Sequence, residues 1–113
     1  MTYLHSWMFL VAAIVCEVAA TTFMKLSDSL TKWVWIAPML AGYLLALGGL
    51  ALALKSIEVG IAYAVWAGAG TLLIAAIGIL FFGEGTSPLK LASMALVIAG
   101  VVGLNLADAL SRA

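Results

Sequence analysis

Long apolar runs without a charged residue constrain the fold of this sequence most strongly. Residues 34–54, 61–82 and 91–107 contain no Asp, Glu, Lys or Arg. The first two runs reach the roughly 20 residues that a helix needs to cross the hydrocarbon core of a membrane. A further run, residues 3–24, is interrupted by one charge, Glu17. The sequence therefore predicts an all-α membrane protein with four transmembrane helices.

The connectors between these runs indicate a simple organisation. They are short and contain Ser, Asp and Gly, which favour turns, and Pro88 suits the first turn of a helix. None is long enough to fold outside the membrane, so we expect a single transmembrane domain over residues 1–113. The predicted spans cover residues 6–24, 34–54, 60–82 and 88–106.

Composition excludes most other classes of protein. Charged residues make up 9% of the chain, far below the roughly 25% of an ordinary soluble domain. That scarcity leaves no basic surface of the kind that binds nucleic acid. With one cysteine, Cys16, and one histidine, His5, the sequence offers neither a disulfide framework nor a Cys or His metal cluster. No nucleophile–base pair indicates an enzyme, and we expect no cofactor.

The cationic residues give only a weak preference for orientation. With both termini and the middle connector on one side of the membrane, that side holds Lys55 and Arg112. The other side holds Lys25, Lys32 and Lys90. An excess of one cation is too small to fix the orientation by the positive-inside rule. Two interpretations stay open: the chain adopts one topology, or it inserts in both orientations.

Glu17 is the residue that points most directly to function. It follows Trp7, an expected interface residue, by ten positions, which places it about 15 Å into a ~30 Å hydrocarbon core. Placing a carboxylate there costs roughly 2.5–3.5 kcal/mol on insertion scales, and burial disfavours its charged form. No Lys or Arg lies at matching depth in any predicted span. The functional interpretation is a proton or cation site; the alternative is a protonated, structural Glu.

Several side chains suggest a polar, aromatic cavity around this carboxylate. Thr21 lies one helical turn from Glu17 and is placed to hydrogen-bond it. In the third span, Tyr63 and Trp66 are three residues apart and share a helix face, where their rings suit an organic cation. Tyr43 lies near the middle of the second span, where a phenol hydroxyl needs a partner. The alternative for these rings is packing against helices or lipid.

Small residues mark two further features. Gly68 and Gly70 lie inside the third span, where glycine favours either a kink or close helix packing. In the fourth span, small residues recur at spacings that let two helices approach closely. These residues are Ser93, Ala99, Gly100 and Gly103, and their pattern predicts an association helix.

Two motifs carry a resemblance that covers nearly the whole chain. The first starts at Glu17 and reads EVAATT, with Lys25 after it. The second, residues 60–70, reads GIAYAVWAGAG. A central Glu in the first span, combined with an Ala-Tyr-Ala-x-Trp segment and the pattern around Gly100, resembles the small multidrug resistance family of bacterial inner-membrane transporters.

The resemblance implies a multi-pass inner-membrane antiporter that exchanges protons for organic cations, with both competing for Glu17. It implies an antiparallel homodimer of dual topology, in which two copies of this Glu share one cavity and the fourth spans form the dimer contact. It also implies a kink at Gly68 and Gly70. The residues that it places in the proton and substrate site are Glu17, Tyr63, Trp66, Tyr43 and Thr21.

The branch of the family is indicated by one position. The branch that exports guanidinium ions typically has a Trp three residues after the Glu, and this sequence has Ala20 there. It therefore looks more like the branch that exports quaternary ammonium and other lipophilic cations. Residues 83–84 and 88–93 look closer to the guanidinium branch, so a guanidinium exporter stays the alternative.

Two further alternatives concern partners and class. The expected partners are membrane lipid and a second copy of the chain. Some family members work as heteromeric pairs, so a paired homologous subunit is the alternative to the second copy. From another class, a proton-carrying subunit of a membrane assembly also uses a mid-membrane carboxylate. The face that holds Tyr63 and Trp66 has no evident use in such a subunit.

Overall fold

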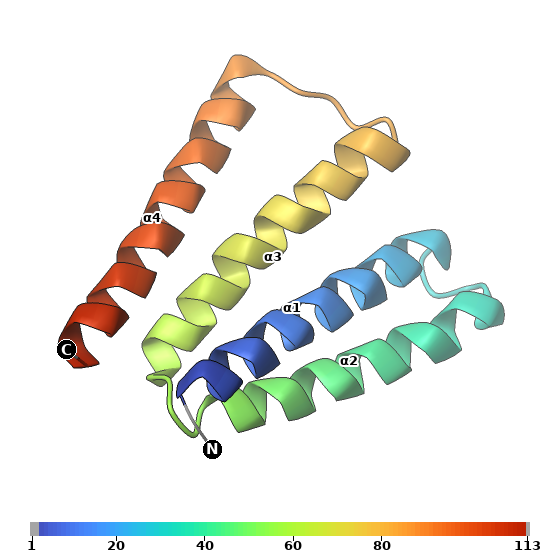
Figure 1. Cartoon of the computed structure of the whole chain (residues 1–113). Helices are drawn as coiled ribbons and strands as arrows, with labels where there is room; N and C mark the ends of the chain where they lie inside the picture. The colour runs from blue at the N-terminus through green and yellow to red at the C-terminus, as the bar shows by residue number, and fades with distance from the viewer. Residues whose placement is uncertain (1–2, 113) are drawn as a thin grey trace. The chain divides into compact units, whose positions relative to one another are not determined.

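The computed structural model describes residues 3–112, and these residues form four helices (Figure 1). The helices are α1 (Tyr3–Leu26), α2 (Trp33–Ala53), α3 (Val59–Phe81) and α4 (Pro88–Arg112). All four are long and apolar enough to cross a membrane, and residues 3–112 contain no strand. The prediction of an all-α chain with four spanning helices is confirmed.

The helices pair into two compact units. The first unit ends at Ile57 and contains α1 and α2; the second starts at Glu58 and contains α3 and α4. Within each unit the two helices run antiparallel, because a short connector joins them (Figure 1). Pro88 begins α4, as its fixed φ angle and missing N–H favour.

A seam of small residues holds α1 against α2. A Cβ atom added to Gly42 would lie 2.9 Å from Ala20 Cβ, and one added to Gly49 would lie 2.9 Å from Ala13 Cβ. Both separations are too short for carbon atoms, so glycine is required at both positions for this approach. Between them lies Ala46, which is 1% exposed. Contacts between small residues let membrane helices pack at short range, and here they fix the register of α1 against α2.

A tight turn connects α1 to α2 and is built around Ser27. The Ser27 hydroxyl donates to Met24 O at 2.6 Å and accepts the Leu30 N–H at 3.0 Å. Its carbonyl accepts the N–H of Thr31 at 2.9 Å. These bonds hold three consecutive residues at positive φ, namely Asp28 (51°), Ser29 (59°) and Leu30 (68°). Each left-handed residue other than Gly costs roughly 1–2 kcal/mol, so the bonds to Ser27 maintain a strained backbone.

The second unit shows a similar use of glycine. A Cβ added to Gly68 in α3 would lie 2.5 Å from Val101 Cγ2 and 3.3 Å from Val97 Cγ1 of α4. The less exposed residues of α4 recur every three or four positions, as expected for one helix packed along another. They are Lys90, Met94, Val97, Val101, Leu104 and Asp108. The other faces of α4 remain exposed.

Candidate functional site

Glu17 lies in the carboxyl-terminal half of α1, one turn before Thr21. The Thr21 hydroxyl donates a hydrogen bond of 3.1 Å to Glu17 Oε1. Residues four apart lie on the same face of a helix, so the expected contact between these side chains is present. Both residues are half-buried. A hydrogen bond to a carboxylate stabilises its charged form. The bond from Thr21 therefore offsets part of the free-energy cost of an ionised Glu17 inside a spanning helix.

Tyr43 of α2 extends this contact across the seam. Its hydroxyl lies 2.9 Å from the hydroxyl of Thr21, within hydrogen-bond distance. The seam explains the contact, because the pairing of Ala20 with Gly42 brings Thr21 and Tyr43 to nearly the same level of the two helices. The three polar side chains form a continuous chain from the phenol of α2 to the carboxylate of α1.

The direction of these hydrogen bonds follows from their proton count. Thr21 has a single hydroxyl proton and gives it to Glu17, so its oxygen is left to accept. Tyr43 is then the donor in the bond to Thr21. Two hydroxyl groups thus act in series on one carboxylate. Such a chain polarises its members in surroundings of low dielectric constant.

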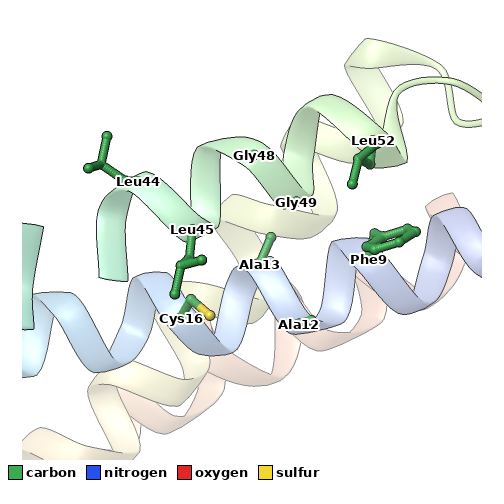
Figure 2. Close-up of a pocket in the computed structure, with 9 residues that line it drawn as sticks. All are labelled: Phe9, Ala12, Ala13, Cys16, Leu44, Leu45, Gly48, Gly49 and Leu52. Carbon is green, nitrogen blue, oxygen red and sulfur yellow. The ribbon is translucent and has the colours of Figure 1, made fainter. Parts of the chain in front are cut away.

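An apolar groove lies between α1 and α2 on the side of the seam that faces away from Glu17. At 100° per residue, Cys16 and Ala12 project on one side of the row formed by Ala13 and Ala20, whereas Glu17 projects on the other. The groove has a volume of about 410 Å³ and is open to its surroundings. Figure 2 shows Leu45 of α2 pointing toward Cys16 of α1. The residues that line the groove are Phe9, Ala12, Ala13, Cys16, Leu44, Leu45, Gly48, Gly49 and Leu52.

A second, polar pocket lies where α1 meets the connector to α2. It has a volume of about 470 Å³ and is lined by Thr21, Met24, Lys25, Asp28 and Ser29. Thr21 is thus a wall of this pocket and also the hydrogen-bond donor to Glu17. Sequence reasoning missed this pocket, because the connector was interpreted only as a turn. The signal for it is the set of polar residues Lys25, Ser27, Asp28 and Ser29 that follows the predicted span.

The two aromatic residues of the predicted site other than Tyr43 lie in the second unit. Tyr63 is 68% exposed, and Trp66, one turn further along α3, is half-buried. An exposed tyrosine in a spanning helix has its ring and its hydroxyl available for a ligand or another chain. The structure describes the two units separately, and the contact of these rings with the cavity around Glu17 stays a prediction.

The predicted kink and the predicted dimer contact remain predictions. The helix α3 is continuous through Gly68 and Gly70, and Gly68 serves close packing against Val101. On α4, the small residues Ser93, Ala99, Gly100 and Gly103 are all exposed. A Cβ added to Gly100 or Gly103 would meet nothing within 4 Å. Within the second unit, this surface lies on a face of α4 that does not pack against α3.

Comparisons with known proteins give a consistent result. Residues 5–97 match the family described as Small Multidrug Resistance protein. The quaternary ammonium compound-resistance protein QacE of Escherichia coli is 46% identical over 91% of this chain and 94% of its own length. The corresponding protein QacF of Klebsiella aerogenes is 45% identical, over 96% and 98% respectively. The membrane protein YvaE of Bacillus subtilis is 48% identical over 91% of this chain and 87% of its own length.

Proposed function

Because this chain belongs to the small multidrug resistance family, and is a multi-pass transporter of the bacterial inner membrane, we propose that it exports quaternary ammonium and other lipophilic cations in exchange for protons. The family contains transporters, so the chain is not an enzyme. The similarity to two quaternary ammonium compound-resistance proteins over nearly their whole length supports this class of substrate. It places the chain in the multidrug branch of the family.

One observation carries the proposed mechanism: Glu17, inside a spanning helix, accepts a hydrogen bond from Thr21, which in turn contacts Tyr43. When Glu17 is ionised, its charge attracts an organic cation, and the hydroxyl chain stabilises that charge. When a proton binds, the charge disappears and the attraction with it. One carboxylate therefore couples the two ions by mutual exclusion.

Protons that arrive from the outer face then displace the cation and leave Glu17 neutral. Once the protonated site faces the cytoplasm, it releases its proton there, and the ionised Glu17 accepts another cation. A difference in proton concentration across the membrane drives export in this scheme. Tyr63 and Trp66 supply the aromatic faces of the cavity. Each cation–π contact contributes about 0.5–2 kcal/mol, and ring contacts tolerate cations of different shapes, as a multidrug transporter requires.

The complete site requires a second copy of the chain. We propose an antiparallel homodimer in which both copies of Glu17 share one cavity, and in which the small residues of α4 meet their counterparts. The exposure of that surface supports the contact. The small excess of cations on one side supports insertion in both orientations. A bend at Gly68 and Gly70 would let the two halves of α3 move as access alternates. A paired homologous subunit is the alternative to the second copy.

Transport in sealed vesicles tests the proposal. Purified protein is reconstituted, and accumulation of tetraphenylphosphonium is measured after a pH gradient is imposed. The wild-type protein should accumulate the cation only with the gradient, and Glu17→Gln should not. Gradient-driven accumulation by Glu17→Gln would overturn the role of Glu17. Accumulation of guanidinium in place of tetraphenylphosphonium would indicate the guanidinium branch. A protein that assembles into large rings of many copies and binds no cation would instead be an assembly subunit.

A further inference from the structure

The polar pocket at the carboxyl-terminal end of α1 is not explained by cation binding alone. We infer that this pocket, lined by Thr21, Met24, Lys25, Asp28 and Ser29, is the aqueous route by which protons reach Glu17, with the Thr21 hydroxyl as the last carrier. This inference rests on the proposed proton exchange at Glu17. It adds a path, a relay residue and a face of the first unit from which the proton comes.

Geometry connects the pocket to the carboxylate. The connector residues Asp28 and Ser29 line the same pocket as Thr21. Thr21 is four residues from Glu17, or about 6 Å along the helix axis, and its hydroxyl closes that gap by its 3.1 Å bond to Oε1. A proton that enters the pocket therefore needs one hydroxyl to reach Glu17.

The polar groups of the lining offer hydrogen-bond partners to water. Carbon atoms form most of the surface of this pocket, but four of its five lining residues, all except Met24, also carry a polar group on the side chain. Water occupies cavities that offer several polar partners, whereas apolar cavities stay dry. The groove on the opposite flank of the seam is a contrast within the same unit, because its lining is apolar apart from Cys16. Lys25 and Asp28 bring one charge of each sign to the polar pocket, which favours its hydration.

The strained turn positions two of the residues that line the pocket. Asp28 and Ser29 both have positive φ, and they reach the pocket only because the chain turns back over the end of α1. Ser27, which is fully buried, holds this turn by its hydroxyl and its carbonyl. Non-glycine residues in left-handed conformations persist where the surrounding structure over-determines them, and they cluster at functional sites.

The proton step balances without another reactant. The Thr21 hydroxyl gives its proton to Oε1 of ionised Glu17, and its oxygen takes a proton from a hydronium ion in the pocket. The hydronium ion leaves as water. Thr21 is neutral before and after the step, and Glu17 gains one proton. In purified protein, where both faces meet the same solution, the reverse sequence carries the proton out through the pocket when a cation binds.

Access of water to the pocket is tested by cysteine modification, separately from transport. In a Cys16→Ala background and in lipid nanodiscs, Met24→Cys is compared with Leu40→Cys, using a charged, water-soluble methanethiosulfonate reagent. Leu40 is the matched control, because it is more exposed than Met24 (52% against 38%) and lines neither pocket. The seam also places it within about 3 Å of the depth of Met24. Met24→Cys should react at least about ten-fold faster, since the reagent attacks the hydrated thiolate; equal rates would overturn the inference.

The role of the pocket in proton movement is tested by filling it. Met24→Trp should slow the release of protons that follows addition of tetraphenylphosphonium, while the total number of protons released stays the same. Leu40→Trp should leave both the rate and the total unchanged. An unchanged rate in Met24→Trp, with its pocket filled, would overturn the route through the pocket. Absence of any release in the wild-type protein would instead overturn the proposed function, whatever the labelling rates.

Discussion

The hydroxyl of Thr21 in α1 lies 2.9 Å from the hydroxyl of Tyr43 in α2, while it donates to Glu17 at 3.1 Å. This arrangement ties a membrane carboxylate to a second helix by way of one small side chain. The carboxylate is therefore not an isolated charge. The stability of the ionised Glu17 carboxylate depends on a hydrogen-bond donor in its own helix, Thr21. Through Thr21 it also depends on the register of α1 against α2.

Removal of the donor should weaken cation binding. Thr21→Val keeps the shape of the side chain and deletes the hydroxyl. A hydrogen bond to a charged group contributes about 1.5–3 kcal/mol, so the affinity for tetraphenylphosphonium at neutral pH should fall about ten-fold or more. Thr21→Ser, which keeps the hydroxyl, should recover most of the affinity. Calorimetric titration in detergent measures both; equal affinities for the two variants would contradict the role of the hydroxyl.

The contribution of Tyr43 should depend on Thr21. Tyr43→Phe alone should lower cation affinity a few-fold, as expected for a neutral hydrogen bond of about 1 kcal/mol. In a Thr21→Val background the same change should have a much smaller effect, because the link to the carboxylate is already lost. Full additivity of the two changes, measured by the same titration, would show that Tyr43 acts independently of the chain.

Adjacent glycines of α2 should respond in opposite ways to alanine. A Cβ at position 48 would have no atom within 4 Å. Gly48→Ala should therefore raise the free energy of unfolding by up to about 1 kcal/mol through helix propensity. Gly49→Ala meets Ala13 Cβ at 2.9 Å and should lower stability by about 1–3 kcal/mol through overpacking. The midpoint of unfolding by sodium dodecyl sulfate, followed by circular dichroism, checks both. Equal shifts would contradict the packing of the α1–α2 seam.

The sequence supports much of the fold and part of the site. The charge-free runs predict the four helices, because a membrane helix needs only length and apolarity. The bond from Thr21 to Glu17 follows from helical spacing within one element. The contact of Thr21 with Tyr43 does not, because it depends on the register between two helices. That register is set by Ala20 against Gly42 and by Ala13 against Gly49. The two alanines are seven residues apart, as are the two glycines, and this equal spacing is the one sign of the register in the sequence.

The turn after α1 shows a second limit of sequence reasoning. The Ser and Asp residues at 27–29 indicate a connector, but propensities do not predict that Asp28, Ser29 and Leu30 all adopt positive φ. Leucine in particular rarely takes this conformation. The turn exists because Ser27 bonds to both sides of it, and this cooperation between neighbours is absent from single-residue preferences. The polar pocket depends on that turn and was missed for the same reason.

Packing between α3 and α4 should be restorable by a paired change. Gly68→Ala introduces a Cβ that would lie 2.5 Å from Val101 Cγ2, so it should destabilise the protein by about 1–3 kcal/mol. Val101→Ala in the same chain removes the clashing methyl group and should restore most of the loss. Thermal unfolding in detergent measures the recovery. Failure of Val101→Ala to recover any stability would contradict this contact.

The exposed small residues of α4 should govern self-association. Gly100→Leu should shift the protein from dimer toward monomer, because a large side chain separates helices that meet through small residues. Ala109→Leu is the matched control, since Ala109 is also exposed on α4 but projects on the helix face opposite Gly100. Sedimentation in density-matched detergent gives the dimer fraction of each variant. An undiminished dimer in Gly100→Leu, or equal loss in both, would place the dimer contact elsewhere.

The most direct test of the central claim is proton release from purified, weakly buffered protein on addition of tetraphenylphosphonium, with guanidinium as the second cation and Glu17→Gln as the control. If one carboxylate serves both ions, the wild-type protein releases protons when the bulky cation binds and Glu17→Gln releases none. Release by guanidinium alone would assign the chain to the other branch of the family. Binding of tetraphenylphosphonium without proton release, or equal release by Glu17→Gln, would contradict competition at Glu17.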